Sequence, residues 1–229
     1  MEIICIYCGN KKATTKDHFP PKCFFPSPRP ANLITVPCCA ICNTKYGKDD
    51  ERVRNLLTSL KTTEKHSAIK KQIAKKRDRS YTRAEGRPNL RHIIASVEKV
   101  RCHSSGGIYF GEALAFDLDQ PTIDRFIERM ARALLYHENG IANAECHVEW
   151  KMAPNEADIV SMPPDIKAFI LGGEVKDIGE GVFSYVGYFY PGRVSSLWLL
   201  NFYGGIEFMI IVRDRKNNQK ASLTNKDRS

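Results

Sequence analysis

Three features of the sequence predict an α+β protein. Two cysteine pairs, at 5 and 8 and at 39 and 42, bracket a short segment that contains two strand-like stretches and leads into a helix. The clearest helical pattern of the chain covers residues 122–137, and apolar strand-like stretches separated by proline and glycine follow it. Because these strands follow one another directly, we expect an antiparallel sheet packed by that one long helix.

The two cysteine pairs have the spacing of a structural zinc site. Each pair reads Cys-x-x-Cys, and together they offer four thiolates to a tetrahedral Zn²⁺, namely Cys5, Cys8, Cys39 and Cys42. Four sulfur ligands leave no position for water, so the metal is expected to act as scaffold. Cys38 could replace Cys39 as a ligand, although the Cys-x-x-Cys spacing favours Cys39.

The segment between the cysteine pairs predicts a hairpin followed by a helix. The strands are expected around Asp17 and His18 and over residues 32–36, joined by the proline-rich loop 20–30. Helical character follows over residues 48–60, where apolar residues recur at spacings of three and four.

Composition narrows the class of protein. The chain has 229 residues, 42% of them hydrophobic, and a formal charge of +9, which favours a polyanionic partner without requiring one. No apolar run is long enough to cross a bilayer, and the first residues do not form a signal peptide. We therefore expect a cytoplasmic protein without a membrane partner, whose cysteines are metal ligands or buried thiols.

A strongly basic stretch follows residue 60. It is expected to form a basic helical arm over residues 61–107, ending with a short helix at 90–100 and a boundary at the Ser-Ser-Gly-Gly of 104–107. Such a run is either a solvated face or a contact to nucleic-acid phosphates, for which the candidates are Lys70, Lys71, Lys75, Lys76 and Arg77. The predicted organisation is 1–60, 61–107, an α+β domain at 108–214 and a polar tail at 215–229.

The second half predicts a packed sheet without a catalytic cluster of its own. The helix at 122–137 has one apolar stripe, and Arg125, Arg129 and Arg132 lie outside it, where they could bind phosphate but where we expect solvated charge. Strands are expected at 108–118, 147–152, 174–178, 182–190, 196–202 and 206–212. The many aromatic residues there are expected to form core or a protein interface, either with a partner or between copies of the chain.

The N-terminal motifs together resemble a known family. Cys-x-x-Cys, Asp-His-x-x-Pro, Asn-Leu-Ile-Thr-Val and Cys-x-x-Cys-Asn-x-Lys occur in this order, and the pattern is similar to the zinc-stapled branch of the HNH endonucleases, whose catalytic unit is the ββα-metal fold. The resemblance covers about the first quarter of the chain. It implies that His18 is the general base and that Asp17 and Asn43 hold one Mg²⁺ or Mn²⁺. Asn32 would be the middle residue of the motif and would help to orient the histidine.

The chemistry of these residues suits cleavage of a phosphodiester. A histidine can activate water near neutral pH, and a hard cation can offset charge on the phosphate and on the leaving oxygen. Adjacent residues of a strand point to opposite faces, so Asp17 and His18 can serve one site only if the chain bends there, as the prolines at 20 and 21 would allow. Simpler roles stay open, with Asn32 as a turn residue and Asn43 as a helix N-cap. Lys45 and Lys48 could contact the scissile phosphate, which we favour for one of them, or be solvated charges.

These observations predict a metal-dependent endonuclease, with DNA favoured over RNA as substrate and a role in genome defence. A single such site cuts one strand at a time, so double-strand cleavage would need two copies or two visits. The competing class is a non-catalytic zinc-binding module that binds nucleic acid or protein.

Overall fold

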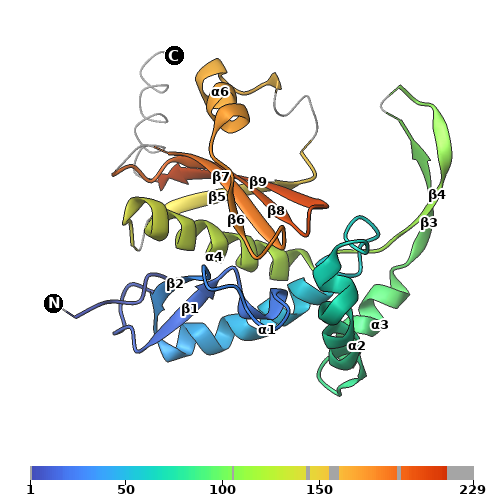
Figure 1. Cartoon of the computed structure of the whole chain (residues 1–229), viewed down its shortest axis with the longest axis horizontal. Helices are drawn as coiled ribbons and strands as arrows, with labels where there is room; N and C mark the ends of the chain where they lie inside the picture. The colour runs from blue at the N-terminus through green and yellow to red at the C-terminus, as the bar shows by residue number, and fades with distance from the viewer. Residues whose placement is uncertain (1, 105, 143–144, 155–159, 190–191, 216–229) are drawn as a thin grey trace, which may run out of the picture.

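The computed structural model describes residues 2–104, 106–142, 145–154, 160–189 and 192–215. It confirms the α+β class, with an N-terminal hairpin and helix that carry four clustered cysteines, further helices, and a five-stranded antiparallel sheet (Figure 1). Of the predicted polar tail, only Arg215 lies within the described residues.

The N-terminal unit has ββα order. Strand β1 (Thr15–Phe19) pairs antiparallel with β2 (Ile34–Cys38), and the short 3₁₀ turn η1 (Lys22–Phe24) lies in the loop between them. Helix α1 (Ala40–Leu57) follows at once and begins eight residues earlier than predicted. The Cys39 side chain accepts from the backbone N–H of Cys42 at the N-terminus of α1, so Asn43 lies in the first turn and is not the N-cap.

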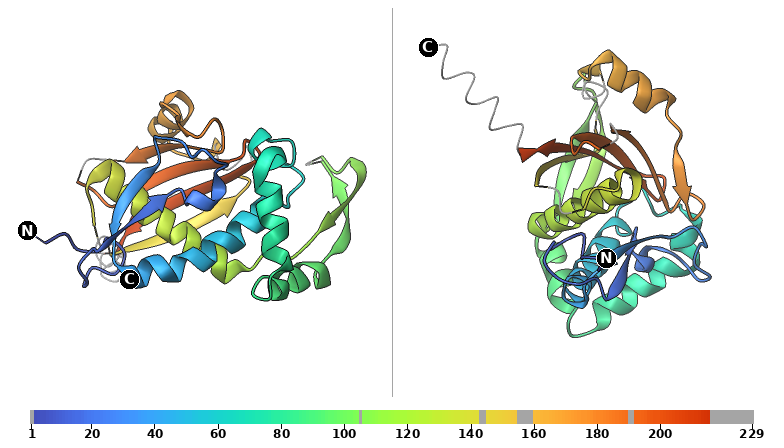
Figure 2. Two further views of the ribbon diagram at one scale, coloured as in Figure 1. Left: turned by 60° about the horizontal axis from the view of Figure 1, so that its bottom comes forward. Right: turned by 90° about the vertical axis from the view of Figure 1, so that its left-hand side faces the viewer.

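The basic stretch is helical at first and then forms an arm of two strands. Its helical part comprises the π-helical turn η2 (Ile69–Ile73), α2 (Ala74–Thr82) and α3 (Arg87–Ala95). The predicted helix at 90–100 is wrong beyond Ala95, because β3 (Glu98–His103) pairs antiparallel with β4 (Tyr109–Ala115). The predicted boundary at 104–107 falls between these two paired strands, which project from the body of the molecule (Figures 1 and 2).

The remaining chain forms α4 and the sheet. Helix α4 (Gln120–Asn139) is capped by the Asp119 side chain and ends at Gly140, whose φ of 67° suits glycine at a helix C-terminus. Then come β5 (Cys146–Met152), α6 (Pro164–Gly172), which the sequence pattern did not predict, β6 (Lys176–Ile178), β7 (Phe183–Phe189), β8 (Ser196–Phe202) and β9 (Ile206–Asp214). The strand order is β5-β9-β8-β7-β6.

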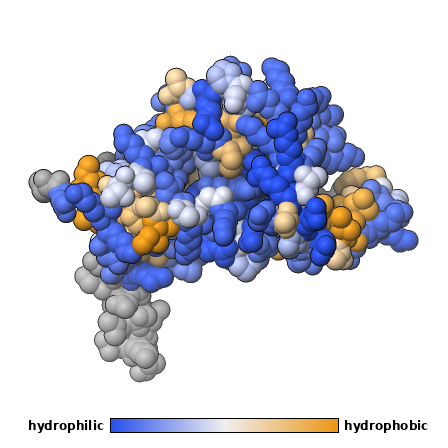
Figure 3. Space-filling view, turned by 90° about the horizontal axis from the view of Figure 1, so that it is seen from below, coloured by the Kyte–Doolittle hydropathy of each residue, from blue (hydrophilic) through white to orange (hydrophobic). Residues whose placement is uncertain are grey.

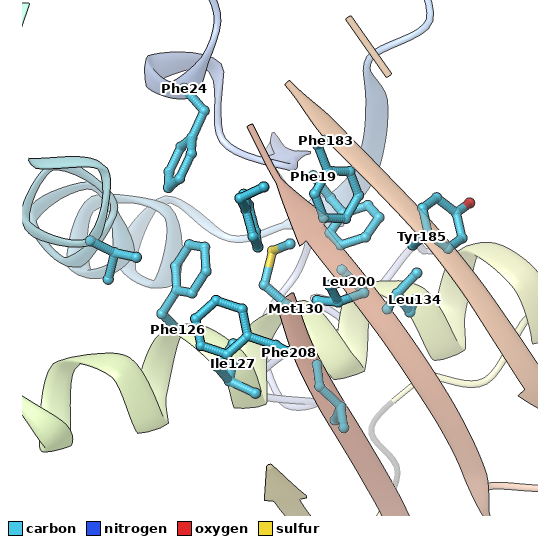
Figure 4. Packing of buried hydrophobic residues seen from close by; sticks show 14 of the residues in the cluster. Phe19, Phe24, Phe126, Ile127, Met130, Leu134, Phe183, Tyr185, Leu200 and Phe208 are labelled. Atoms are coloured by element: carbon cyan, nitrogen blue, oxygen red, sulfur yellow. The ribbon is translucent and has the colours of Figure 1, made fainter. Parts of the chain in front are cut away.

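Helix α4 lies between the ββα unit and the sheet, and packs on both (Figures 1 and 2). The predicted stripe is buried as expected, at Ile123, Phe126, Ile127, Met130, Ala131, Leu134 and Leu135. Figure 4 shows Phe126 and Met130 between Phe24 of the proline-rich loop and Phe208 of the sheet. The hydroxyl of Tyr203 also donates to the Phe24 carbonyl oxygen, at 2.9 Å. The N-terminal unit and the sheet therefore share one hydrophobic core.

Candidate metal centre and catalytic residues

The four predicted cysteines converge in space. The sulfur atoms of Cys5, Cys8, Cys39 and Cys42 all lie within 4.8 Å of one another, and those of Cys8 and Cys39 are 3.9 Å apart. A tetrahedral zinc with bonds of about 2.3 Å would place its sulfur ligands about 3.8 Å apart. The cluster therefore has the donor set and the dimensions to hold a structural Zn²⁺.

The backbone explains how two distant pairs meet. The first pair forms a tight turn in which the N–H of Gly9 donates to the Cys5 carbonyl, and the N–H of Ile6 donates to the Pro37 carbonyl on β2. The second pair follows β2 directly at the start of α1. Cys38 is buried outside the cluster and its thiol donates to the Cys39 carbonyl, so Cys39 is the cysteine that joins the cluster.

Asp17 points to the buried face of β1. Its Oδ2 accepts a hydrogen bond of 2.7 Å from the Tyr7 hydroxyl, and its Oδ1 accepts the backbone N–H of His18 at 2.9 Å. Tyr7 belongs to the first cysteine pair, and burial together with Asp17 raises the pKa of its hydroxyl, which keeps it protonated as a donor. The cysteine cluster thus positions the tyrosine that orients the Asp17 carboxylate.

Arg129 of α4 closes the same site from the other side. Its Nη1 lies 3.8 Å from Asp17 Oδ2 and 3.2 Å from Asp50 Oδ2, while its Nη2 contacts Asp50 Oδ1, and the guanidinium lies over the Tyr46 ring. Only 3% of Arg129 is exposed. The expectation that Arg129 is a solvated charge is therefore wrong, because it is buried and contacts the carboxylates of Asp17 and Asp50.

The charges of Arg129, Asp17 and Asp50 do not cancel one another. Burial alone would lower the pKa of Arg129, but Asp50 and Asp17 raise it, so the guanidinium remains charged. Burial raises the pKa of the Asp50 carboxyl to about 6, against the attraction of Arg129. With both carboxylates ionised, one guanidinium faces two negative charges and one negative charge remains uncompensated.

Asn43 contacts the face of β1 to which Asp17 belongs. Its Nδ2 donates to Thr15 Oγ1 at 3.2 Å, and Asp17 lies two residues beyond Thr15 on that face of β1. Within the described residues, Asn43 Oδ1 accepts no hydrogen bond. A Mg²⁺ ion needs few protein oxygens because it keeps several waters. Carboxylate and amide oxygens are kinds of ligand that such an ion takes, but both oxygens of Asp17 already accept hydrogen bonds and Arg129 lies beside one of them.

His18 lies on the other face of β1. The pairing of Asp17 with Val36 and of His18 with Thr35 is regular, so the bend that would bring the two side chains to one face is not present within β1. The half-buried imidazole has its pKa lowered by burial and by the charges of Lys22 and Arg29, which outweigh the opposing effect of Asp17. It is therefore neutral near pH 7 and able to accept a proton.

The other predicted site residues lie apart from these. Asn32 is exposed, and its Nδ2 donates to the Asp177 carbonyl at 3.0 Å, which ties the loop before β2 to β6. Its role in orienting His18 stays a prediction.

The predicted phosphate-binding residues fall into two groups. Lys76 donates to the Phe25 carbonyl and Arg77 to the Thr58 carbonyl, so both have structural contacts. The others are exposed and stay candidates for phosphate contact, namely Lys45, Lys48, Lys70, Lys71 and Lys75.

Sequence reasoning missed Tyr7, Asp50 and Arg129. Tyr7 could have been noticed because it lies inside a metal-binding motif next to the predicted site. Asp50 was read only as a charge at the start of a helix, and the arginine lies 79 residues away, on an element whose placement no local pattern specifies.

Comparison with known proteins adds no relative. No protein-family model, curated protein or solved structure matches this chain. Among the described residues, no helix has the length and apolar character to cross a bilayer. The fold and the cysteine cluster therefore define a ββα unit with a site that could hold a structural metal, built into a larger α+β body.

Substitution of single cysteines tests the metal site. Cys39→Ser is expected to reduce the zinc content well below one per chain, because three sulfurs and a hydroxyl form a poorer site. Cys38→Ser, at the neighbouring buried position, is expected to retain one zinc per chain. Elemental analysis of the purified variants measures both. Loss of zinc from Cys38→Ser together with retention in Cys39→Ser would contradict the assignment.

Paired arginine substitutions on α4 test the buried ion pairs. Arg129→Met is expected to destabilise the fold by about 3–5 kcal/mol, because it leaves two buried carboxylates without a counter-charge. Arg125 pairs with the single carboxylate of Asp49 and is itself 39% exposed, so Arg125→Met is expected to cost clearly less than Arg129→Met. Urea unfolding of both variants gives the comparison, and equal losses would refute the special role of Arg129.

Proposed function

We propose that this chain is a metal-dependent endonuclease that hydrolyses phosphodiester bonds, with DNA as the favoured substrate. The observation that carries the proposal is that Asp17 lies on the face of β1 that Asn43 contacts, in a ββα unit whose helix is joined to the N-terminal turn by four clustered cysteines. The same residues are the ones that the resemblance to HNH endonucleases assigns to the catalytic ion.

The proposed chemistry divides between the two faces of β1. Asp17, oriented by Tyr7, and Asn43 would hold the divalent ion, which when bound offsets negative charge on the phosphate and the leaving oxygen. His18 would take the proton from the attacking water, for which its lowered pKa suits it.

A phosphodiester must reach both faces for this to work. Among the described strands β1 pairs only with β2, which leaves its outer edge unpaired. We place the scissile phosphate at this edge, where side chains from either face can approach it. Lys22 and Arg29 are exposed in the loop after β1, and their charge acts on His18, so they favour an anion on that side.

A second candidate function is a non-catalytic module that binds nucleic acid or protein. Two observations favour it: Arg129 already supplies a positive charge to Asp17, and His18 does not share a face with Asp17. In this alternative the ββα unit is purely a scaffold, and the exposed lysines of α1 and η2 contact the partner.

A cleavage assay separates these functions. His18→Ala is expected to lower the rate of plasmid nicking in Mg²⁺ or Mn²⁺ by about a hundredfold or more, because it removes the general base. Zinc content and circular dichroism should be unchanged. His92→Ala, an exposed histidine on α3, is the matched control and should nick at the wild-type rate.

Each result of the cleavage assay supports a different function. If the wild-type chain shifts DNA in gels but nicks neither DNA nor RNA, the binding module is the better account. Cleavage of RNA alone would keep the enzyme and change the substrate. Nicking by His18→Ala at the wild-type rate would remove His18 from the mechanism.

A further inference from the structure

Strands β3 and β4 form an arm that belongs neither to the five-stranded sheet nor to the β1–β2 hairpin. Within the described residues its strands pair with each other and with no other strand. Figure 1 shows it projecting from the body beyond α3. An isolated pair of strands is marginally stable in water and needs a third strand or a packing surface.

Exposed apolar side chains are concentrated on this arm. Ile108, Tyr109, Phe110 and Leu114 are all more than half exposed, with Phe110 at 70% and Leu114 at 69%. Figure 3 shows apolar side chains gathered at the end of the molecule where the arm lies, beside a largely hydrophilic face. Large exposed apolar patches of this kind mark surfaces that bind another molecule.

The charge of the arm argues against nucleic acid as that molecule. Over residues 98–115 the acidic Glu98 and Glu112 balance the basic Lys99 and Arg101, and Lys99 already pairs with Glu112 at 3.1 Å. The whole chain carries +9, so the arm is neutral within a basic protein. Binding to a phosphate backbone depends on an excess of positive charge, and the arm, whose net charge is zero, offers Arg101 alone outside the Lys99–Glu112 pair.

We propose that the arm is a dimerisation element that pairs with the arm of a second copy of this chain. Identical strand edges are complementary to each other in antiparallel pairing, and that pairing generates a two-fold axis. Two bodies of charge +9 repel each other, so a contact through neutral projecting arms has the lowest electrostatic cost. Pairing would convert two isolated ribbons into one sheet of four strands, in which apolar side chains of the two copies contact each other across the new strand pair.

This proposal goes beyond the proposed function and does not depend on it. If the chain is a nuclease, a dimer brings two cutting sites to one substrate. If the chain only binds, the dimer doubles its contact surface.

Light scattering coupled to gel filtration tests the proposal on the full chain. The wild-type protein is expected to elute with twice the 26.0 kDa chain mass. Leu114→Glu is expected to raise the dissociation constant of the dimer by tenfold or more, because it places a charge in an apolar contact. Phe110→Ser provides a second variant with the same expectation. Both positions are exposed, so circular dichroism should match the wild type.

The matched control is Leu171→Glu on α6, since Leu171 has the same 69% exposure as Leu114. It should remain dimeric. A wild-type chain that is monomeric at high micromolar concentration overturns the proposal, as does a Leu114→Glu variant that dimerises like the wild type. A monomeric wild type whose DNA gel shift is lost in Leu114→Glu would also overturn it, in favour of an arm that contacts nucleic acid.

Discussion

The contact of Arg129 with Asp50 and Asp17 joins the two halves of this molecule at the predicted site. The arginine comes from α4, which packs the sheet, and the carboxylates come from α1 and β1 of the ββα unit. All three residues are buried, so the ion pairs form in a medium where an unpaired charge is costly. The packing of α4 against the sheet therefore determines where the positive charge that faces the Asp17 carboxylate lies.

A second constraint reaches the same carboxylate from the cysteine cluster. Tyr7 is placed by the turn that brings Cys5 and Cys8 together, and its hydroxyl fixes the orientation of Asp17. Outer groups of this kind normally orient a metal-binding carboxylate. In this protein they include a full positive charge, which sets a competition between Arg129 and any divalent ion at Asp17. If the divalent ion displaces Arg129 from Asp17, the ββα unit can be catalytic. If Arg129 keeps its contact with Asp17, the unit is purely structural.

The parts of this structure that could be predicted from sequence are those that leave a local sequence pattern. Cysteine spacing located the cluster of four thiols that could hold a metal, and the apolar stripe of α4 identified the helix that fills the core. Long-range contacts could not be predicted in this way. Arg129 lies outside the apolar stripe, and its burial depends on the packing of α4 against α1. Residues 98–100 continued a helical pattern but pair with β4 instead, because strand pairing overrides a weak local preference. The residues Asn32 and Asp177, which contact each other, lie 145 positions apart in the sequence, and no local sequence pattern predicts their contact.

The proposed function requires Asp17 and Asn43 to bind a divalent ion although Arg129 already contacts Asp17. Anomalous diffraction from a crystal soaked in Mn²⁺, recorded at the manganese absorption edge, tests it most directly. The proposal requires a manganese peak bounded by the Asp17 carboxylate and the Asn43 amide oxygen, distinct from the metal of the cysteine cluster. A map with signal at the cysteines alone, and with Arg129 still in contact with Asp17, would contradict it.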